Sequence, residues 1–421
     1  MAGWMRVMAD RFSSLAQRDF RNLWLGGVLV FVGVQMQFFL RGILAWELTE
    51  RSDALGLVFF VFGGSLLVST PLGGVATDRL AKRTVLLASQ VVLSSSAGLI
   101  GLVVLLDVVA FWMLLAAAMT QGIAFGFAGP ARVAMASDIV GRENLGNAIS
   151  LQSLAFNGTR VFAPSLAGAL VGWSLFGLEG AYLVAATMNV LGLALTAILP
   201  NPPAQLTGKA RPFKDVADGV RYVAATPAIR NVVLTTFAVL MFGFSYLTFI
   251  PALVEGEFGL GEQEVGLFTS AGSVGALLAA IWVAGIADSP RAPMLMTVAG
   301  VIFGVMIVAV GLAPGYLLAA GFAVVGGAGT TVFQTLSNTL ALTASTPEFQ
   351  GRVQSIMQLG FAGFGLASLP LGVLAEQIGL RPTLMIMGAM TAVSVLGFGL
   401  FGRAAVSKRI SDDADLQEVI A

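Results

Sequence analysis

Apolar runs long enough to cross a lipid bilayer recur along nearly the whole chain of 421 residues. A helix needs about 20 residues to cross roughly 30 Å of hydrocarbon. The runs are apolar on all sides, whereas the strands of a membrane barrel would be short and alternating, so we expect helices. The predicted spans are residues 22–47, 54–76, 84–106, 110–134, 148–173, 178–199, 230–254, 264–287, 293–313, 315–340, 353–377 and 382–403. The sequence therefore predicts an all-α membrane protein with twelve transmembrane helices.

The composition excludes several classes of function. Hydrophobic residues make up 57% of the chain and charged residues 11%, compared with about a quarter charged in an ordinary soluble domain. The formal net charge is zero, so nothing indicates a nucleic-acid partner. Cysteine and histidine are both absent, which removes thiolate chemistry and the usual zinc ligands, and no phosphate-binding loop is present. We therefore expect no enzyme activity, no metal and no cofactor.

The placement of Lys and Arg predicts how the chain is oriented, because basic loops stay in the cytoplasm during insertion. Every second loop is basic. The only Lys or Arg residues in the loops between them are Arg51 and Arg381. The loop after the seventh span is acidic and contains Glu255, Glu257, Glu262 and Glu264. Four arginines precede the first apolar run, which is not typical of a cleavable signal peptide. Both termini are therefore expected in the cytoplasm.

One long polar interruption divides the chain almost in half. It runs from Pro200 to Pro227, and apolar residues at helical spacing predict an amphipathic helix between Pro212 and Pro227. The segment that begins at Gly74 has a partner beginning at Gly285, which favours two related halves. The predicted organisation is a cytoplasmic segment (1–21), a six-helix bundle (22–199), a cytoplasmic linker (200–229), a second six-helix bundle (230–403) with pseudo-two-fold symmetry to the first, and a cytoplasmic tail (404–421).

The loop after the second span resembles the signature of the major facilitator superfamily. Gly74 is followed by Asp78 and Arg79, and then by the basic pair Lys82 and Arg83; Ala81 stands where the family usually has a second glycine. Residues 129–168 are similar to the branch that includes bacterial siderophore and macrolide exporters. The resemblance covers roughly residues 20–403. It implies the twelve-span fold in a bacterial plasma membrane, with spans 1, 4, 7 and 10 around a central cavity and a small-molecule substrate gated by rocking of the halves. We expect a monomer.

Charged residues at the predicted cytoplasmic ends of the spans are candidates for a gate. Asp78 lies where unsatisfied helix amides attract an acid, and nearby basic residues can pair with opposing acids. We expect Asp78, Arg79 and Arg83 to hold the cytoplasmic gate shut. Their candidate partners are Arg132, Asp288 and Arg352. The alternative is that these charges only set the topology and solvate the loops.

Two arginines lie well away from the ends of predicted spans, and a charge costs at least about 2.5 kcal/mol at the bilayer centre. Arg160 lies near the middle of the fifth span with Asn157 one turn earlier, and Arg41 lies in the outer part of the first span with Gln37 one turn earlier. The functional interpretation is that both arginines bind an anion or a carbonyl group in the cavity. The structural interpretation is that Arg160 ties helices together and that Arg41 extends to the outer interface.

Other polar side chains on the cavity spans are candidates for the substrate path. They are Gln35, Gln121, Tyr246, Gln334, Asn338 and Gln358. Each of them alone is also consistent with hydrogen bonding between helices in lipid.

No Asp or Glu lies deep in any predicted span, which makes proton coupling doubtful unless it uses a peripheral carboxylate such as Glu47. A coupling proton or ion therefore stays open. Three hypotheses remain for the function. The first is a secondary active exporter of a small amphipathic or anionic compound, such as a drug or a siderophore. The second is a lysophospholipid or lipid flippase, or an importer, and the third is a transport-inactive receptor or assembly partner.

Overall fold

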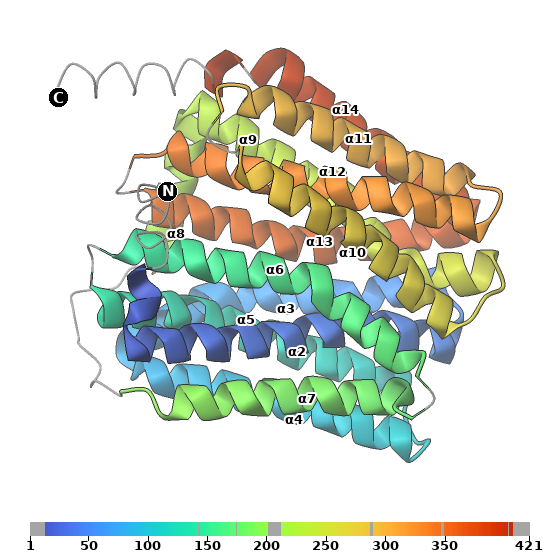
Figure 1. Cartoon of the computed structure of the whole chain (residues 1–421), viewed down its shortest axis with the longest axis horizontal. Helices are drawn as coiled ribbons and strands as arrows, with labels where there is room; N and C mark the ends of the chain where they lie inside the picture. The colour runs from blue at the N-terminus through green and yellow to red at the C-terminus, as the bar shows by residue number, and fades with distance from the viewer. Residues whose placement is uncertain are drawn as a thin grey trace, which may run out of the picture. The chain divides into compact units, whose positions relative to one another are not determined.

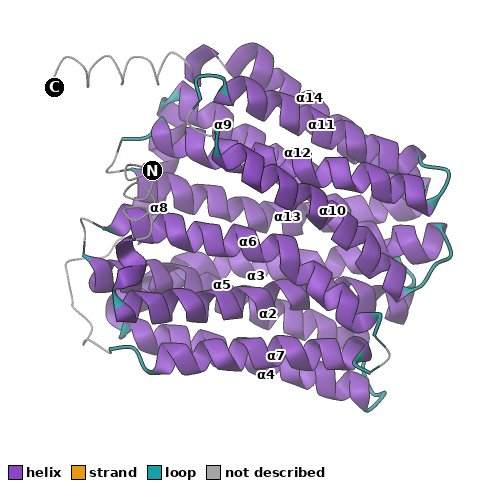
Figure 2. Ribbon diagram, viewed as in Figure 1, coloured by secondary structure: helices purple, strands orange, loops and turns teal. Residues whose placement is uncertain are grey.

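The computed structural model describes residues 13–141, 144–173, 175–200, 212–286, 289–346, 349–402 and 404–406. Every regular element in these residues is helical (Figure 2). Eleven of the described helices are long and apolar enough to cross a membrane. The helix α6, Leu145–Val171, is not among the eleven, but its 27 residues are also long enough to span the hydrocarbon. The all-α membrane fold is therefore confirmed.

The helices form two compact units. The first unit comprises the described residues of Met1–Leu44 and Gly64–Pro212, and the second those of Ala45–Gly63 and Phe213–Ala421. The turn between the first two long helices thus packs with the second unit. The elements up to residue 200 are η1 (Ser13–Ala16), α2 (Arg18–Thr49), α3 (Ser52–Arg79), α4 (Lys82–Leu105), α5 (Phe111–Val140), α6 and α7 (Gly177–Ala197).

The elements after residue 211 belong to the second unit (Figure 1). They are α8 (Pro212–Ala225), α9 (Pro227–Ala238), η2 (Val239–Gly243), η3 (Phe244–Phe249), η4 (Ala252–Glu257), α10 (Glu262–Ala284), α11 (Ala292–Leu312), α12 (Tyr316–Thr343), α13 (Gln350–Ile378), α14 (Leu380–Gly397) and η5 (Phe398–Gly402). The helix α8 lies where the sequence predicts an amphipathic helix. Its Tyr222 ring stacks on Phe349 with the ring centroids 4.1 Å apart.

The two units repeat the same packing pattern. In the first unit α4 lies along α7, and in the second α11 lies along α14 (Figure 1). Glycines permit close approach between α3 and α5 in the first unit, where a Cβ at Gly73 would overlap the Gly126 carbonyl. They do the same between α10 and α12, where a Cβ at Gly275 would overlap the Val324 carbonyl. Small residues at such contacts let backbones approach in lipid, where no hydrophobic force drives helices together.

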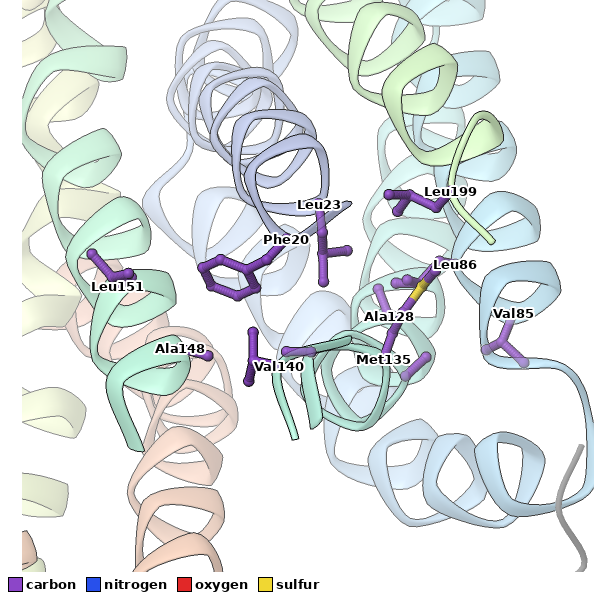
Figure 3. Packing of buried hydrophobic residues seen from close by; sticks show 12 residues of the cluster. Phe20, Leu23, Val85, Leu86, Ala128, Met135, Val140, Ala148, Leu151 and Leu199 are labelled. Atoms are coloured by element: carbon purple, nitrogen blue, oxygen red, sulfur yellow. The ribbon is translucent and has the colours of Figure 1, made fainter. Parts of the chain in front are cut away.

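The core of the first unit includes an apolar cluster at one end of its helices (Figure 3). Phe20 and Leu23 of α2 lie between side chains of α4, α5 and α6, and Phe20 is completely buried. Beside the cluster, the Trp24 indole N–H donates to the Leu151 carbonyl at 2.8 Å. These contacts hold α2 against α5 and α6 near the residues described below.

The predicted seventh span, residues 230–254, is not a uniform α-helix. The α-helical pattern ends at Ala238 and continues as a π turn (η2), a 3-10 helix (η3) and a second π turn (η4). Pro251 has no N–H to donate and its ring crowds the carbonyl four residues earlier, which explains the interruption before η4. Such π turns within helices occur frequently at functional sites.

Candidate functional site

Arginine and phenylalanine side chains from three helices meet in the first unit. The Phe31 ring of α2 packs edge-on against Phe156 of α6, with the ring centroids 5.1 Å apart, and Phe125 of α5 lies 6.1 Å from Phe156. The Arg132 guanidinium carbon of α5 lies 4.7 Å from the centroid of Phe31, and that of Arg160 lies 5.9 Å from Phe156. We call these five residues the arginine–phenylalanine cluster.

The position of Arg132 depends on a glycine of the neighbouring helix. A Cβ at Gly27 of α2 would overlap Nη1 of Arg132, so only a residue without a side chain leaves room for this guanidinium. Arg132, a predicted partner in the cytoplasmic gate, is 5% exposed. Its contacts therefore tie α5 to α2 inside the unit.

The cluster combines positive charge with aromatic faces. A guanidinium over a ring gains roughly 0.5–2 kcal/mol, which is less than the cost of placing a charge among the membrane spans. Within the described part of the chain, no carboxylate forms an ion pair with Arg132. A bound anion would supply the missing negative charge, and an aromatic or flat apolar group would pack against the phenylalanine rings. The arrangement is thus suited to an amphipathic anion.

A second polar group joins α2 to α5. Arg41 is 2% exposed, and its Nη2 donates to Oε1 of Gln121 at 2.5 Å. The Gln121 amide donates to the Val34 carbonyl at 3.4 Å, and Gln37 donates to Gly33 at 3.2 Å on its own helix. Gln37 and Gln121 are also fully buried. The Arg41 head group is therefore packed between helices and does not extend to an interface.

The remaining predicted cavity residues are spread over both units. Gln35 of α2 is half-buried, and the side chain of Asn157 lies outside the described residues. In the second unit Tyr246 of η3 is 7% exposed and lies edge-on to Phe303, with the ring centroids 6.0 Å apart. The half-buried residues Gln334 and Asn338 are one turn apart on α12, and Gln358 of α13 is exposed.

The predicted gating residues of the first unit lie at the ends of its helices. Asp78 and Arg79 are exposed at the end of α3. Arg83 donates through Nη2 to the carbonyl of Ala197, the last residue of α7. A neighbouring ion pair that the sequence did not reveal joins Lys82 Nζ to Asp138 Oδ2 at 2.5 Å. These contacts hold the start of α4 against the ends of α5 and α7.

A cavity of about 600 Å³ lies at the same helix ends. It is lined by Gln17, Arg18, Asp19, Lys82, Arg83, Met135, Asp138, Ile139 and Pro200. Its charges largely offset one another, because the lining holds three bases and two acids. It is therefore less suited to an anion than the arginine–phenylalanine cluster.

The other two gating candidates belong to residues 213–421. Arg352 lies over the Phe349 ring at 5.0 Å and packs against α8, where a Cβ at Gly219 would lie 3.2 Å from the Arg352 Cβ. Asp288 lies outside the described residues.

Sequence reasoning identified Arg160 but missed the phenylalanines around it. A signal for Phe156 was present, because it precedes Arg160 by four residues and so shares its helix face. No comparable signal connects Phe31 or Gly27 with Arg132, since these residues are about a hundred positions apart in the chain.

The model of the Major Facilitator Superfamily matches residues 23–364. Among curated proteins, the chain is 26% identical over 402 residues to the enterobactin exporter EntS of Shigella flexneri, covering 94% of this chain and 88% of that protein. The enterobactin exporter EntS of Escherichia coli O139:H28 is 25% identical, again covering 94% of this chain and 88% of that protein.

Solved structures share the fold at low sequence identity. A POT family transporter in complex with a thioalcohol-conjugated peptide matches with a TM-score of 0.71 and 15% identity, covering 94% of this chain and 99% of that one. The nucleoside transporter NupG gives a TM-score of 0.69 at 13% identity, covering 90% and 99%. A bacterial homologue of the human lysosomal transporter Spinster gives 0.64 at 15% identity, covering 96% and 94%.

Proposed function

Because the chain belongs to the Major Facilitator Superfamily and is therefore a multi-pass secondary transporter, we propose that it exports a small amphipathic or anionic compound, such as a drug or a siderophore. The resemblance of its loop signature to this superfamily is thereby confirmed. The superfamily is one of transporters and not of enzymes. Export, the class of substrate and a bacterial inner-membrane location are the proposal.

The arginine–phenylalanine cluster carries the proposal about the substrate. Arg132 and Arg160 bring two positive charges to three aromatic rings within one helical unit. Ionic hydrogen bonds from a guanidinium are about twice as strong as neutral ones. An anionic group of the substrate would accept them while its apolar part covers the rings. A neutral sugar would lack the negative charge that pairs with the two guanidinium groups.

The direction of transport rests on the curated relatives and on the charge pattern. The relatives are named as exporters of enterobactin, and the similarity to them covers most of both chains. Basic residues at the end of α3 and the start of α4 support, by the positive-inside rule, a cytoplasmic location for this end of the first unit. We expect both termini on the same side. An exporter working by alternating access would bind its substrate from this side.

Asp78 and Arg79 are proposed to latch the cytoplasmic gate during this cycle. Both are exposed at the end of α3, where a charged side chain is accessible to a partner. Arg83 contributes differently, because it already donates to the last carbonyl of α7, where a cation is favoured by the helix dipole. Arg83 would then keep α4 and α7 together as the gate opens. Asp288 and Arg352 stay candidate partners from the other half.

Binding is tested by thermal stabilisation of the purified protein with a panel of enterobactin, aromatic carboxylates, drugs, sugars and lysolipids. We expect anionic aromatic compounds to raise the melting temperature of the wild type. Arg160→Ala should abolish this rise, and Arg160→Lys should recover only part of it because an ammonium cannot reproduce the planar guanidinium contacts. Arg51→Ala is the matched control, since Arg51 is 63% exposed and pairs with Asp53 outside the cluster.

Three outcomes would count against the proposal. A rise that is unchanged in Arg160→Ala would make Arg160 structural. Stabilisation by lysolipids alone would favour a lipid flippase. A panel without any stabilising compound would favour the transport-inactive receptor.

A further inference from the structure

A carboxylate with one unpartnered oxygen among the described residues lies at the end of the seventh span. Glu255 belongs to the π turn η4, just beyond the candidate span Pro227–Phe249. Its side chain is half-buried, and its Oε1 is buried with no hydrogen-bond partner among the described residues. A buried carboxylate oxygen that accepts no hydrogen bond is costly while it is charged. Such a group invites protonation.

The surroundings of Glu255 are apolar on one side and acidic on the other. Ala252, Leu253 and Val254 precede it and are at most 1% exposed. The indole of Trp46 lies against the next residue, because a Cβ at Gly256 would lie 2.7 Å from Trp46 Cζ2. These neighbours exclude water from part of the carboxyl group.

The charged groups on the adjoining elements do not compensate Glu255. The helix α10 brings Glu262, and the segment of α2 that carries Trp46 also carries Glu47. The helix α14 brings a cation, Arg381, but this side chain donates to Glu257 Oε2 at 2.8 Å and to the Ala313 carbonyl at 2.8 Å. Arg381 is thus engaged by another carboxylate.

The electrostatic consequence agrees with this geometry. Burial, and secondarily the negative charge of Glu262, raise the pKa of Glu255 to about 7. A group with this pKa exchanges protons near neutral pH. Histidine is the usual residue for this role, and the chain contains none.

We propose that Glu255 is the proton-binding residue of the transport cycle, so that substrate is exported in exchange for protons. This inference rests on the proposed transport function. The carboxylate takes up one proton from water on its side of the membrane and becomes a neutral acid, which fits its half-buried place. Exchange then requires the cycle to expose the carboxyl group to the opposite side, where it would return the proton to water and regain its negative charge.

The π turn offers a way to couple protonation to movement. Around Glu255 the amides of Phe258 and Leu260 donate to the carbonyls five and six residues earlier, and that of Gly259 donates four residues back, to the carbonyl of Glu255 itself. A π turn holds one residue more than an α-helical turn, so a change of register can rotate the following residues. Protonation makes the carboxyl group neutral and lowers the cost of burying it. Protonation would therefore shift the equilibrium between the two helix registers.

The first test uses Trp46 as a reporter and needs no substrate. Tryptophan fluorescence of the purified full-length protein is followed from pH 5 to pH 9. We expect a transition centred near pH 7 in the wild type, and its loss in Glu255→Gln and in Trp46→Phe. Glu262→Gln is the matched control and should keep the transition but move it to lower pH, since a neighbouring negative charge is removed. A transition that survives unchanged in Glu255→Gln would overturn the assignment.

The second test measures coupling in proteoliposomes, with enterobactin as the probe. An imposed pH gradient should drive uphill transport by the wild type and by Glu262→Gln. Glu255→Gln should retain downhill transport and lose its response to the gradient. Uphill transport by Glu255→Gln, or wild-type transport that ignores the gradient, would refute the proposal. If the wild type moves no enterobactin, the proposed export of this compound fails, and the fluorescence titration decides separately whether Glu255 binds the proton.

Discussion

The hydrogen bond between Arg41 and Gln121 allows a quantitative prediction. Both side chains are almost fully buried, and Arg41 Nη1 has no hydrogen-bond partner among the described residues, so Gln121 supplies the guanidinium with its main acceptor. A hydrogen bond to a charged group contributes about 1.5–3 kcal/mol. Gln121→Leu should therefore lower the free energy of unfolding by about 2–3 kcal/mol, because a buried charge is left without its acceptor.

Removing the charge as well should restore the loss. In the double variant Gln121→Leu with Arg41→Met, no polar group of the pair remains, and burial of an arginine in a span costs at least about 2.5 kcal/mol. We expect the double variant to be more stable than Gln121→Leu alone by about 2 kcal/mol. Denaturant unfolding of the purified protein in detergent, followed by circular dichroism, measures all four members of the cycle.

Two results would refute this reasoning. If Gln121→Leu is as stable as the wild type, the charge finds another acceptor and the hydrogen bond contributes nothing. If the double variant is as unstable as Gln121→Leu, the loss comes from packing around residue 121 and not from an unpaired charge.

Three further predictions concern other parts of the chain. Gly27→Ala should displace the Arg132 guanidinium and weaken substrate binding by about 2- to 30-fold, the equivalent of a cation–π contact. It should change stability little, because only the end of a flexible side chain must move. Because the pKa of Glu255 is raised in the folded state, the wild type should lose stability as pH rises from about 4.5 to about 7. Glu255→Gln should therefore be as stable as the wild type below about pH 4.5. Above pH 7 it should be more stable by roughly 1–2 kcal/mol, after allowance for solvent screening. Gly365→Val should destabilise the second unit by about 1–3 kcal/mol, since a Cβ there already lies 2.7 Å from the Cα of Gly63 and backbone cannot yield as a side chain does.

Each of these predictions has a control and a contradicting result. A Cβ at Gly158 would meet nothing within 4 Å, so Gly158→Ala is the control for Gly27→Ala and should leave binding unchanged. Equal substrate affinity of Gly27→Ala and the wild type would show that Arg132 does not contact substrate. A stability difference between Glu255→Gln and the wild type that does not vary with pH would contradict the raised pKa. Gly397→Val, where a Cβ also meets nothing within 4 Å, is the control for Gly365→Val, and equal melting temperatures for both would contradict the close packing at Gly365.

The sequence predicted the helices because membrane hydrocarbon imposes a length and an apolarity that hydropathy records directly. It also identified Arg160 and Arg41, since charges inside apolar runs stand out. It did not reveal that Arg41 pairs with Gln121, although both were candidates, because 80 residues separate them and only the packing of α2 on α5 brings them together.

Features that depend on tertiary contact or on backbone register were beyond sequence reasoning. The room that Gly27 leaves for Arg132 and the ion pair of Lys82 with Asp138 are of the first kind. The π turn at Glu255 is of the second kind. The acidic loop after the seventh span was recognised, yet composition does not distinguish Glu257, which has an arginine partner, from Glu255, whose Oε1 accepts no hydrogen bond.

The export of an anionic compound through the arginine–phenylalanine cluster is tested most directly in inside-out membrane vesicles, where export appears as uptake. Radiolabelled enterobactin should accumulate in vesicles that contain the wild type, above the level in vesicles without the protein, and this accumulation should be lost in Arg160→Ala and kept in Arg51→Ala. Accumulation that persists in Arg160→Ala, or that occurs only in right-side-out vesicles, would contradict the account.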